Sequence, residues 1–337
     1  MNRKRIKHIK RLTGMLSAAF LCAALVLPAQ ASAISSAAEQ SALAQTQAAV
    51  TAQSTTIKKN FVGMTEIFAT NWSSLTKTIS ADLTGDNKND KIKIKSTVNS
   101  YGYVKKLTVK VKGKTALTLK FDTYDTLNVS VDYVRQSKNR EFLYIYGYGE
   151  DDYTTVCRIY TYNKKTGKLK CVLKADNSVK PLAMAQLTSV TKKKITVYYS
   201  AQPLVTGYIN WSYSYVYKNG KFKATSKSSS TVKCGCASIS DTAYRSYLEN
   251  NQYVTQKKLK LYKTAGSKKV AATIKADKVV TLKKICVKNG KIWLKFSCGK
   301  KSGWIKVNTI KENYTDAEYQ KYYKNNTNWF YGIGYAG

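Results

Sequence analysis

A short stretch rich in aspartate has the residue types and the spacing of a cation site. In the segment DLTGDNKND, oxygen-bearing side chains stand at loop positions 1, 3, 5 and 9, and position 7 can offer a backbone carbonyl. These residues are Asp82, Thr84, Asp86 and Asp90, with Lys88 at position 7. Oxygen ligands in a tight loop suit a hard cation, so the spacing predicts one structural calcium site. The alternative is a metal-free turn of Asp, Asn and Gly.

The same segment resembles a known family. The 13 residues DLTGDNKNDKIKI are similar to the calcium loop and following strand of FG-GAP/VCBS-type repeats, which build the blades of bacterial and integrin β-propellers. By that resemblance Asp82, Asp86 and Asp90 would be side-chain ligands, and Thr84 stands where such loops usually have Asn or Asp. The lysines that follow add repulsion for a cation, so we expect weak binding.

A second candidate site lies near the C-terminus. The segments KLKLYKTAG, KKVAATIKADKVVTLKKI and IWLKFSCGKKSGWIKV are similar to a bacterial SH3-type domain over nearly all of residues 255–308. The resemblance implies binding of wall peptide or glycan, with Tyr262, Trp293 and Trp304 as candidate ligand contacts. Packing inside the barrel is the alternative for both tryptophans. The first strand has Leu-Tyr-Lys where many members have an Arg-Ser or Arg-x-Gly motif.

The residues that most hydrolases need are missing. The only histidine is His8, in a segment that we predict is removed. This excludes Ser-His and Cys-His nucleophile pairs and His-ligated catalytic zinc in the mature chain. The remaining acidic cluster, Glu150, Asp151 and Asp152, falls in a predicted turn between strands. We therefore expect no enzyme, and a carboxylate-based polysaccharide hydrolase is the third alternative for the function.

The charge of the chain predicts an anionic partner. The sequence has 57 Lys+Arg against 19 Asp+Glu and a formal charge of +38. Lysine alternates with apolar residues along several segments, so whole sheet faces should be cationic and attract polyanions. Peptidoglycan or an anionic wall polymer is the expected partner, and we do not expect nucleic acid. The alternative role for these lysines is solubility and protection of edge strands.

The first residues have the pattern of an export signal. Residues 1–11 are basic, residues 15–27 are apolar, and Ala31 and Ala33 have the spacing of a signal-peptidase site. Cleavage after residue 33 removes six basic residues and no acid, which lowers the formal charge from +38 to about +32. The apolar run is shorter than the ~20 residues of a membrane span, which argues against the alternative of an uncleaved anchor. We expect a secreted protein, associated with the cell wall and without a span after cleavage.

Export also changes the interpretation of the cysteines. Six remain after cleavage: Cys157, Cys171, Cys234, Cys236, Cys286 and Cys298. An even number in an exported chain favours disulfides. Zinc is the first alternative, although the usual Cys-x2-Cys spacing is missing, and free thiols are the second.

The strands that must position these residues form a layout that repeats. Residues 34–57 are a linker rich in Ala, Ser, Gln and Thr that we expect to be disordered. In residues 58–230 three blocks of alternating strands are aligned on turns at Gly113, Gly167 and Gly220, roughly 53 residues apart. The period predicts an FG-GAP/VCBS-like antiparallel β domain of blade-like sheets, arranged as a partial propeller or as a sandwich.

Two helices should border the barrel. The first is expected at residues 238–251, within a linking segment 231–253, with Ser240 or Asp241 as N-cap. An Asn289-Gly290 hairpin lies inside the expected SH3-type barrel, residues 254–310. The second helix, with a capping box of Thr315 and Glu318, opens a C-terminal segment 311–337 that ends in an aromatic tail.

These features together predict a secreted, mainly β, non-catalytic protein that binds the cell wall or another surface. The SH3-type barrel would recognise wall peptide or glycan, and the cationic surface would retain the protein electrostatically. The alternative is a secreted adhesin that binds a surface protein through the propeller-like domain.

Overall fold

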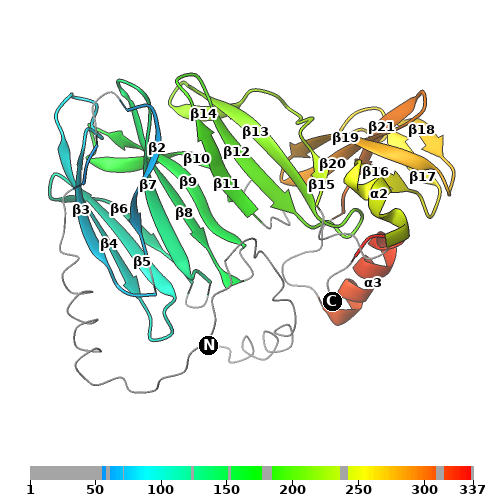
Figure 1. The fold of residues 1–337 in the computed structure, drawn as a ribbon, viewed down its shortest axis with the longest axis horizontal. Coiled ribbons are helices and arrows are strands. Elements are labelled where there is room, and N and C mark those ends of the chain that lie inside the picture. The colour runs from blue at the N-terminus through cyan, green and yellow to red at the C-terminus, as the bar shows by residue number, and fades with distance from the viewer. Residues whose placement is uncertain are drawn as a thin grey trace, which may run out of the picture. The chain divides into compact units, whose positions relative to one another are not determined.

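The computed structural model describes residues 55–57, 61–70, 72–122, 125–150, 153–176, 184–235, 242–308 and 315–334. The predicted signal peptide and most of the predicted linker lie outside these residues. The described chain is mainly β, as predicted, with four sheets whose neighbouring strands are antiparallel except at one two-residue strand (Figure 1). That strand, β1 (Thr55–Thr56), pairs with β3 inside the range predicted as linker, so ordered structure begins slightly earlier than expected.

Each of the three predicted blocks is one antiparallel sheet of four successive strands. Sheet A contains β3 (Thr76–Ala81), β4 (Asp90–Val98), β5 (Val104–Val111) and β6 (Lys114–Lys120), with β1 at its edge. Sheet B contains β7 (Asn128–Ser137), β8 (Arg140–Tyr148), β9 (Thr154–Asn163) and β10 (Lys168–Lys174), and β2 (Gly63–Ala69) pairs with β7. Sheet C contains β11 (Met184–Val190), β12 (Ile195–Ala201), β13 (Ile209–Lys218) and β14 (Lys221–Ala224), and β15 (Lys233–Cys234) pairs with β13.

The glycine turns of the repeated layout all close hairpins. Gly113, Gly167 and Gly220 have φ values of 80°, 66° and 72° and lie between β5 and β6, β9 and β10, and β13 and β14. Glycine adopts this left-handed conformation without the steric cost that a side chain adds. The sequence signal for the three hairpins is therefore confirmed.

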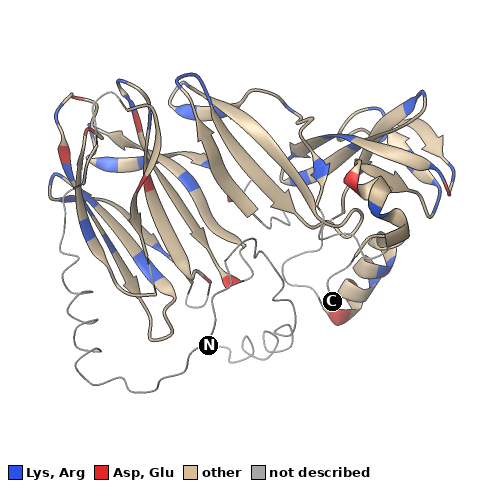
Figure 2. Ribbon diagram, in the orientation of Figure 1, with Lys and Arg blue, Asp and Glu red and all other residues tan. Residues whose placement is uncertain are grey.

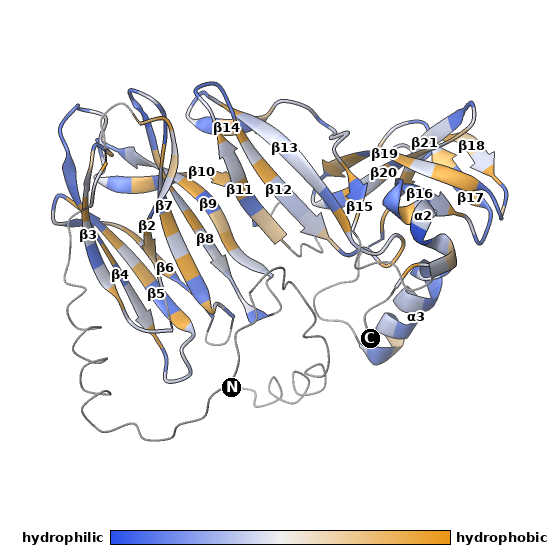
Figure 3. Ribbon diagram, in the orientation of Figure 1, coloured by the Kyte–Doolittle hydropathy of each residue, from blue (hydrophilic) through white to orange (hydrophobic). Residues whose placement is uncertain are grey.

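Sheet B contributes to two hydrophobic cores because both of its faces are covered. Along β7, Val131 and Tyr133 pack in one core with residues of sheet A such as Ile94, while Val134 belongs to another core with Tyr199 of sheet C. Figure 3 shows the alternation of hydrophobic and hydrophilic residues along these strands. Despite this alternation in residue type, β7 and β8 are buried in nearly continuous runs, as expected for strands covered on both faces.

Sheet D, the predicted barrel, is open. It contains β16 (Gln252–Val254), β17 (Leu259–Tyr262), β18 (Val270–Ile274), β19 (Val279–Lys288), β20 (Lys291–Cys298) and β21 (Lys301–Lys306). Its strand order is β16-β19-β20-β21-β17-β18, so β16 and β18 remain edges within the described residues, and the expectation of closure is wrong. β17 meets β21 at one pair, Tyr262 with Trp304, where a Cβ on Gly303 would come within 2.8 Å of the Tyr262 carbonyl oxygen.

The C-terminal segment covers part of sheet D. Phe330 is 1% exposed, forms an isolated bridge with Thr255, and packs with its ring centroid 5.0 Å from that of Tyr253. Ile333 is also buried. The described part of the aromatic tail therefore packs against its own domain, which gives edge strand β16 a neighbour that the sequence pattern does not reveal.

The two helices differ in how well the sequence predicted them. Helix α3 (Asp316–Asn326) has the predicted capping box, in which Thr315 Oγ1 accepts from the Glu318 N–H and the Glu318 carboxylate accepts from the Thr315 N–H. Helix α2 (Arg245–Glu249) follows a 3-10 turn at Thr242–Tyr244 and is shorter than the predicted 238–251. The expected N-caps Ser240 and Asp241 lie outside the described residues. The helix ends before Asn251, whose φ of 57° cannot continue it.

Candidate functional site

The acidic loop between β3 and β4 brings the predicted oxygen atoms together. Asp82 accepts hydrogen bonds from the N–H groups of Asp86 at 3.0 Å and Asn87 at 2.9 Å. Asp90 accepts from the Thr84 N–H at 2.7 Å, and Asp86 accepts from the Lys88 N–H at 2.9 Å. The loop is therefore folded around its own carboxylates, an arrangement that the alternative of a metal-free turn also allows.

A lysine from the next hairpin supplies a positive charge to this loop. Lys112, at the turn between β5 and β6, places its Nζ 2.9 Å from Asp90 Oδ1 and 3.3 Å from Asp86 Oδ2. The bond to Asp90 raises the pKa of Lys112. The Lys88 N–H, and then Lys112, lower the pKa of Asp86. An ammonium thus lies between two of the three carboxylates that a calcium ion would use.

The residues as arranged therefore hold a cation of their own. A divalent ion would have to displace the Lys112 ammonium, and no group of three or more His, Cys, Asp or Glu side chains in the described part of the chain has the arrangement of a metal site. Calcium binding at this loop stays a prediction, and Lys112 is its competitor.

The loop also contacts sheet B. Tyr133 on β7 donates its hydroxyl to the Asp82 carbonyl oxygen at 3.1 Å. The β7–β8 turn lies close to Gly85. A Cβ added to Gly85 would be 3.1 Å from Asn139 Oδ1 of this turn. Glu141 of β8 is buried and pairs with Arg135 at 3.2 Å. These contacts give the loop a structural role between sheets A and B.

The three predicted ligand residues of sheet D lie in different environments. Trp293 is 9% exposed on β20, whereas Trp304 on β21 and Tyr262 on β17 are half-buried. Trp304 lines a groove, and neither Tyr262 nor Trp293 is among the residues that line it. The structure therefore separates one candidate contact from the other two.

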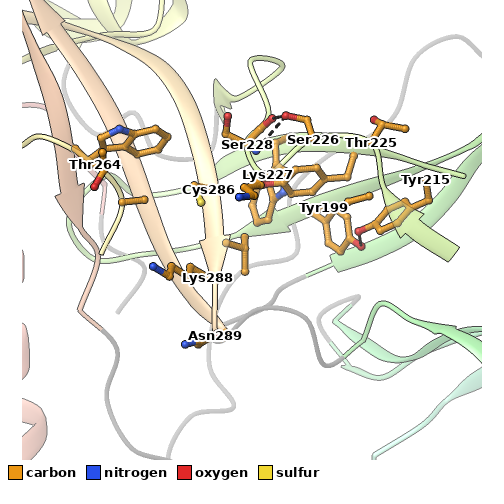
Figure 4. A pocket seen from close by; sticks show the side chains of 17 residues that line it. Tyr199, Tyr215, Thr225, Ser226, Lys227, Ser228, Thr264, Cys286, Lys288 and Asn289 are labelled. Atoms are coloured by element: carbon orange, nitrogen blue, oxygen red, sulfur yellow. Dashed lines mark hydrogen bonds between the residues drawn. The ribbon is translucent and has the colours of Figure 1, made fainter. Parts of the chain in front are cut away.

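This groove, which we call the aromatic groove, lies between sheets C and D. It has a volume of about 1090 Å³ and brings together Tyr199, Trp211, Tyr213 and Tyr215 of sheet C with Trp304 of sheet D. Figure 4 shows Tyr199 and Tyr215 on one side and Thr264, Cys286 and Lys288 on the other. A concave site lined by aromatic rings and a few polar groups is typical of ligand binding.

The floor of the groove is a packed set of rings. Tyr199 stacks on Trp211 with centroids 5.5 Å apart and an interplanar angle of 11°, and its hydroxyl lies 2.6 Å from that of Tyr215. Burial raises the pKa of Tyr215 to about 12, so this hydroxyl stays protonated at neutral pH. Trp211 is 1% exposed, and its indole Nε1 has no hydrogen-bond acceptor in the described structure.

The rim of the groove is polar and cationic. Thr225, Ser226 and Lys227 are exposed after the end of β14, and Ser226 Oγ donates to the Ser228 carbonyl oxygen at 2.7 Å. From sheet D come Thr264 and, next to the Asn289-Gly290 turn, the exposed Lys288. Hydroxyl groups and ammonium groups thus surround the aromatic floor.

Backbone hydrogen bonds hold the two sides of the groove together. Ser229 and Ile285 exchange two N–H to carbonyl bonds of 2.8 and 2.9 Å. Tyr213 also donates its hydroxyl to the Ile285 carbonyl oxygen at 3.4 Å. Near the start of β13, where β15 pairs with it, Asn251 accepts from the Cys234 N–H at 2.7 Å. The segment predicted as a linker is therefore tied to both sheets.

The cysteines do not form the expected disulfides. Cys157, Cys171, Cys234, Cys286 and Cys298 are free, and Cys236 lies outside the described residues. Burial raises the pKa of Cys157 to about 12, and its sulfur lies 3.7 Å from the Tyr144 hydroxyl. Cys286 is buried in the wall of the groove, where burial also raises its pKa. Raised thiol pKa values disfavour the thiolate that disulfide chemistry needs.

The acidic cluster of the hydrolase alternative is described only in part. Glu150 accepts a hydrogen bond from the Tyr103 hydroxyl at the surface, while Asp151 and Asp152 lie outside the described residues. Among the described helices none is long and apolar enough to cross a bilayer.

No protein-family model, curated protein or solved structure matches this chain. The likenesses to FG-GAP/VCBS-type repeats and to SH3-type domains therefore stay predictions.

Proposed function

We propose that this chain is a secreted, non-catalytic protein that binds cell-wall peptide or glycan, and that the aromatic groove is its recognition site. The observation that carries the proposal is the groove itself, in which Trp304 of the SH3-like segment meets the rings of sheet C. In this proposal sheets A, B and C are a partial propeller and sheet D is an open variant of the SH3 type.

The chemistry of the groove suits a polar ligand with an apolar face. Rings such as Tyr215 and Trp304 offer flat apolar surface, while Thr225, Ser226 and Thr264 offer hydroxyl groups. The unsatisfied Nε1 of Trp211 leaves a donor that a water or ligand oxygen at the floor would satisfy. Sugar rings and short wall peptides combine these two characters.

The direct test is co-sedimentation of residues 34–337 with purified peptidoglycan sacculi, with and without their anionic polymer, over a salt series. Trp304→Ala should reduce binding to polymer-free sacculi about fivefold or more, because truncating a ring on which a ligand stacks costs at least about 1 kcal/mol of binding free energy. The matched control is Trp72→Ala, since Trp72 is 63% exposed and lies outside the groove.

Two results would contradict the proposal. Absence of binding to both preparations would exclude the cell wall as the target. Equal losses for Trp304→Ala and Trp72→Ala would exclude the groove. Salt-resistant binding to one surface protein, with no binding to sacculi, would favour the adhesin.

A further inference from the structure

Sheet A has an outward face built from three residue types. The strand register places the apolar side chains of β3, β4 and β5 toward sheet B, and the alternate positions point away from it. These outward positions carry lysine, threonine or serine. Their lysines form what we call the lysine face: Lys91, Lys93, Lys95, Lys106, Lys110 and Lys120.

Some of these lysines stand directly opposite each other. Lys93 pairs in register with Lys110, and Lys106 pairs with Lys120. Like charges in directly opposed cross-strand positions are destabilising. Neighbouring strands lie ~4.8 Å apart and successive outward residues ~6.8 Å apart, well within a Debye length of ~10 Å at 0.1 M salt. The repulsion is therefore not removed by solvent ions at moderate salt.

No carboxylate in the described part of the chain neutralises this face. None of its six lysines makes an ion pair with any residue that the structure describes, whereas Lys112 at the adjoining turn has two carboxylate partners. Figure 2 shows the basic residues as blue bands along β4 and β5. Among the described residues no carboxylate neutralises the lysine face, which leaves its ammonium groups open to an external polyanion.

We propose that the lysine face binds a linear polymer of phosphodiester groups, laid across sheet A. The ammonium groups of lysine pair with phosphate as point charges, and the intervening threonine hydroxyls donate to phosphate oxygens. This inference rests on the proposed function for its cell-wall setting, and it is independent of the aromatic groove, which belongs to other sheets.

The same face does not suit nucleic acid. β3, β4, β5 and β6 contain no aromatic residue on which bases could stack, as single-stranded nucleic acid requires. The major groove of a duplex admits a helix or a two-stranded ribbon, and a flat sheet of this width is too broad for it. A flexible polymer read only through its charge fits the face better.

The experiment measures binding of labelled poly(glycerol phosphate) to residues 34–337 over a salt series. The triple variant Lys93→Gln, Lys95→Gln, Lys110→Gln should lose about tenfold in affinity at ~0.1 M salt. The slope of log K against log salt should become less negative by about two, at ~0.7 per lost phosphate contact on a flexible strand. The matched control neutralises Lys192, Lys193 and Lys194, three exposed lysines before β12, and should lose less than about threefold.

The outcomes separate this inference from the proposed function. Equal losses in both triple variants would show that only net charge matters and would overturn the inference. Tighter binding of single-stranded DNA than of poly(glycerol phosphate) at equal charge would overturn the choice of polymer. Trp304→Ala should keep its affinity for the polymer whether or not it binds polymer-free sacculi. Thermal unfolding of both triple variants confirms that they are folded.

Discussion

The acidic loop and the aromatic groove treat their polar groups in opposite ways. In the loop, Asp82 and Asp90 have their hydrogen-bonding capacity used by backbone N–H groups and by Lys112. In the groove, the Nε1 of Trp211 has no acceptor, and Lys227 and Lys288 have no ion-pair partner among the described residues. Both regions have residues suited to binding, but the carboxylates of the loop are paired within the chain, whereas these groups of the groove have no partner among the described residues.

The difference lies in where the partners of the polar groups come from. Because a lysine of the same chain pairs with the carboxylates, an external cation would have to compete with it, and the loop as arranged contributes to stability. The groove is assembled between two sheets, and a donor at its floor has no acceptor in the described part of the chain. Polar groups without a hydrogen-bond or ion-pair partner, rather than residue type, therefore distinguish a candidate binding site from a structural loop.

The test with the largest expected effect concerns a buried carboxylate that has no ammonium partner among the described residues. Asp132 on β7 is 8% exposed, and burial, followed by the charge of Glu66, raises its pKa from 3.8 to about 7. Because the folded state holds this proton more tightly, stability is full below pH ~4 and falls as the pH rises to about 7. Asp132→Asn should therefore raise the free energy of unfolding at pH 8 by about 2 to 4 kcal/mol, with little change at pH 4.

Urea denaturation at pH 4 and pH 8 measures both values. Glu66→Gln is the control, since it removes the exposed neighbouring charge and should give a much smaller gain at pH 8. The same gain from Asp132→Asn at both pH values would contradict the assignment, because it would not depend on ionisation.

The second test removes the ammonium group that pairs with the carboxylates of the loop. Lys112→Met leaves Asp90, whose side chain is fully buried, without its cation, and should cost about 2 kcal/mol of unfolding free energy. The loss is moderate because Lys112 itself is half exposed. Millimolar calcium should restore part of this stability in the variant and change that of the parent chain much less.

Thermal unfolding with calcium and with magnesium measures this effect. Lys114→Met, an exposed lysine in the same hairpin, is the control and should be insensitive to either ion. If calcium stabilises the parent chain as strongly as the variant, the ammonium is not the competitor of the metal.

The sequence predicted contiguous features well and discontinuous ones poorly. Asp82 to Asp90 form a loop from nine successive residues, and the hairpins follow from glycine turns, so local pattern is sufficient for both. Lys112 lies 22 positions beyond Asp90 and reaches the loop only because β4 and β5 are paired. The sequence around either residue therefore does not predict the contact between Lys112 and the loop.

The groove could be anticipated only in part for the same reason. Trp304 was a candidate from its segment, but Tyr199, Trp211 and Tyr215 look like ordinary inward residues of alternating strands. Their role depends on how sheet C meets sheet D at Ser229. Closure of the barrel failed as a prediction because alternation fixes which face of a strand is buried and does not fix its partner.

The third test concerns the floor of the groove. Tyr215→Phe removes one member of the hydroxyl pair with Tyr199 and leaves the ring packing in place. It should cost about 1 kcal/mol of unfolding free energy, the usual value of one buried hydrogen bond. Tyr217→Phe on the same strand is the control, since the Tyr217 ring packs on Phe142 and Tyr217 is not among the residues that line the groove. A loss no larger than that of the control would mean that the pair contributes nothing to the floor.

The test with the smallest expected effect concerns the lysine face, whose charges have no ion-pair partner among the described residues. Lys93→Thr removes one partner of the directly opposed pair with Lys110 and places a good strand former at an outward position. It should raise the unfolding free energy by about 0.5 kcal/mol at low salt, because cross-strand like charges repel by amounts of this size. The gain should shrink at ~1 M salt, where the Debye length falls to ~3 Å.

Lys95→Thr, which faces Thr76 and Thr108, has no opposed lysine and should gain less. If both variants respond equally, the repulsion is spread over the whole face, and the lysine face then acts as a uniform charged surface without specific rows.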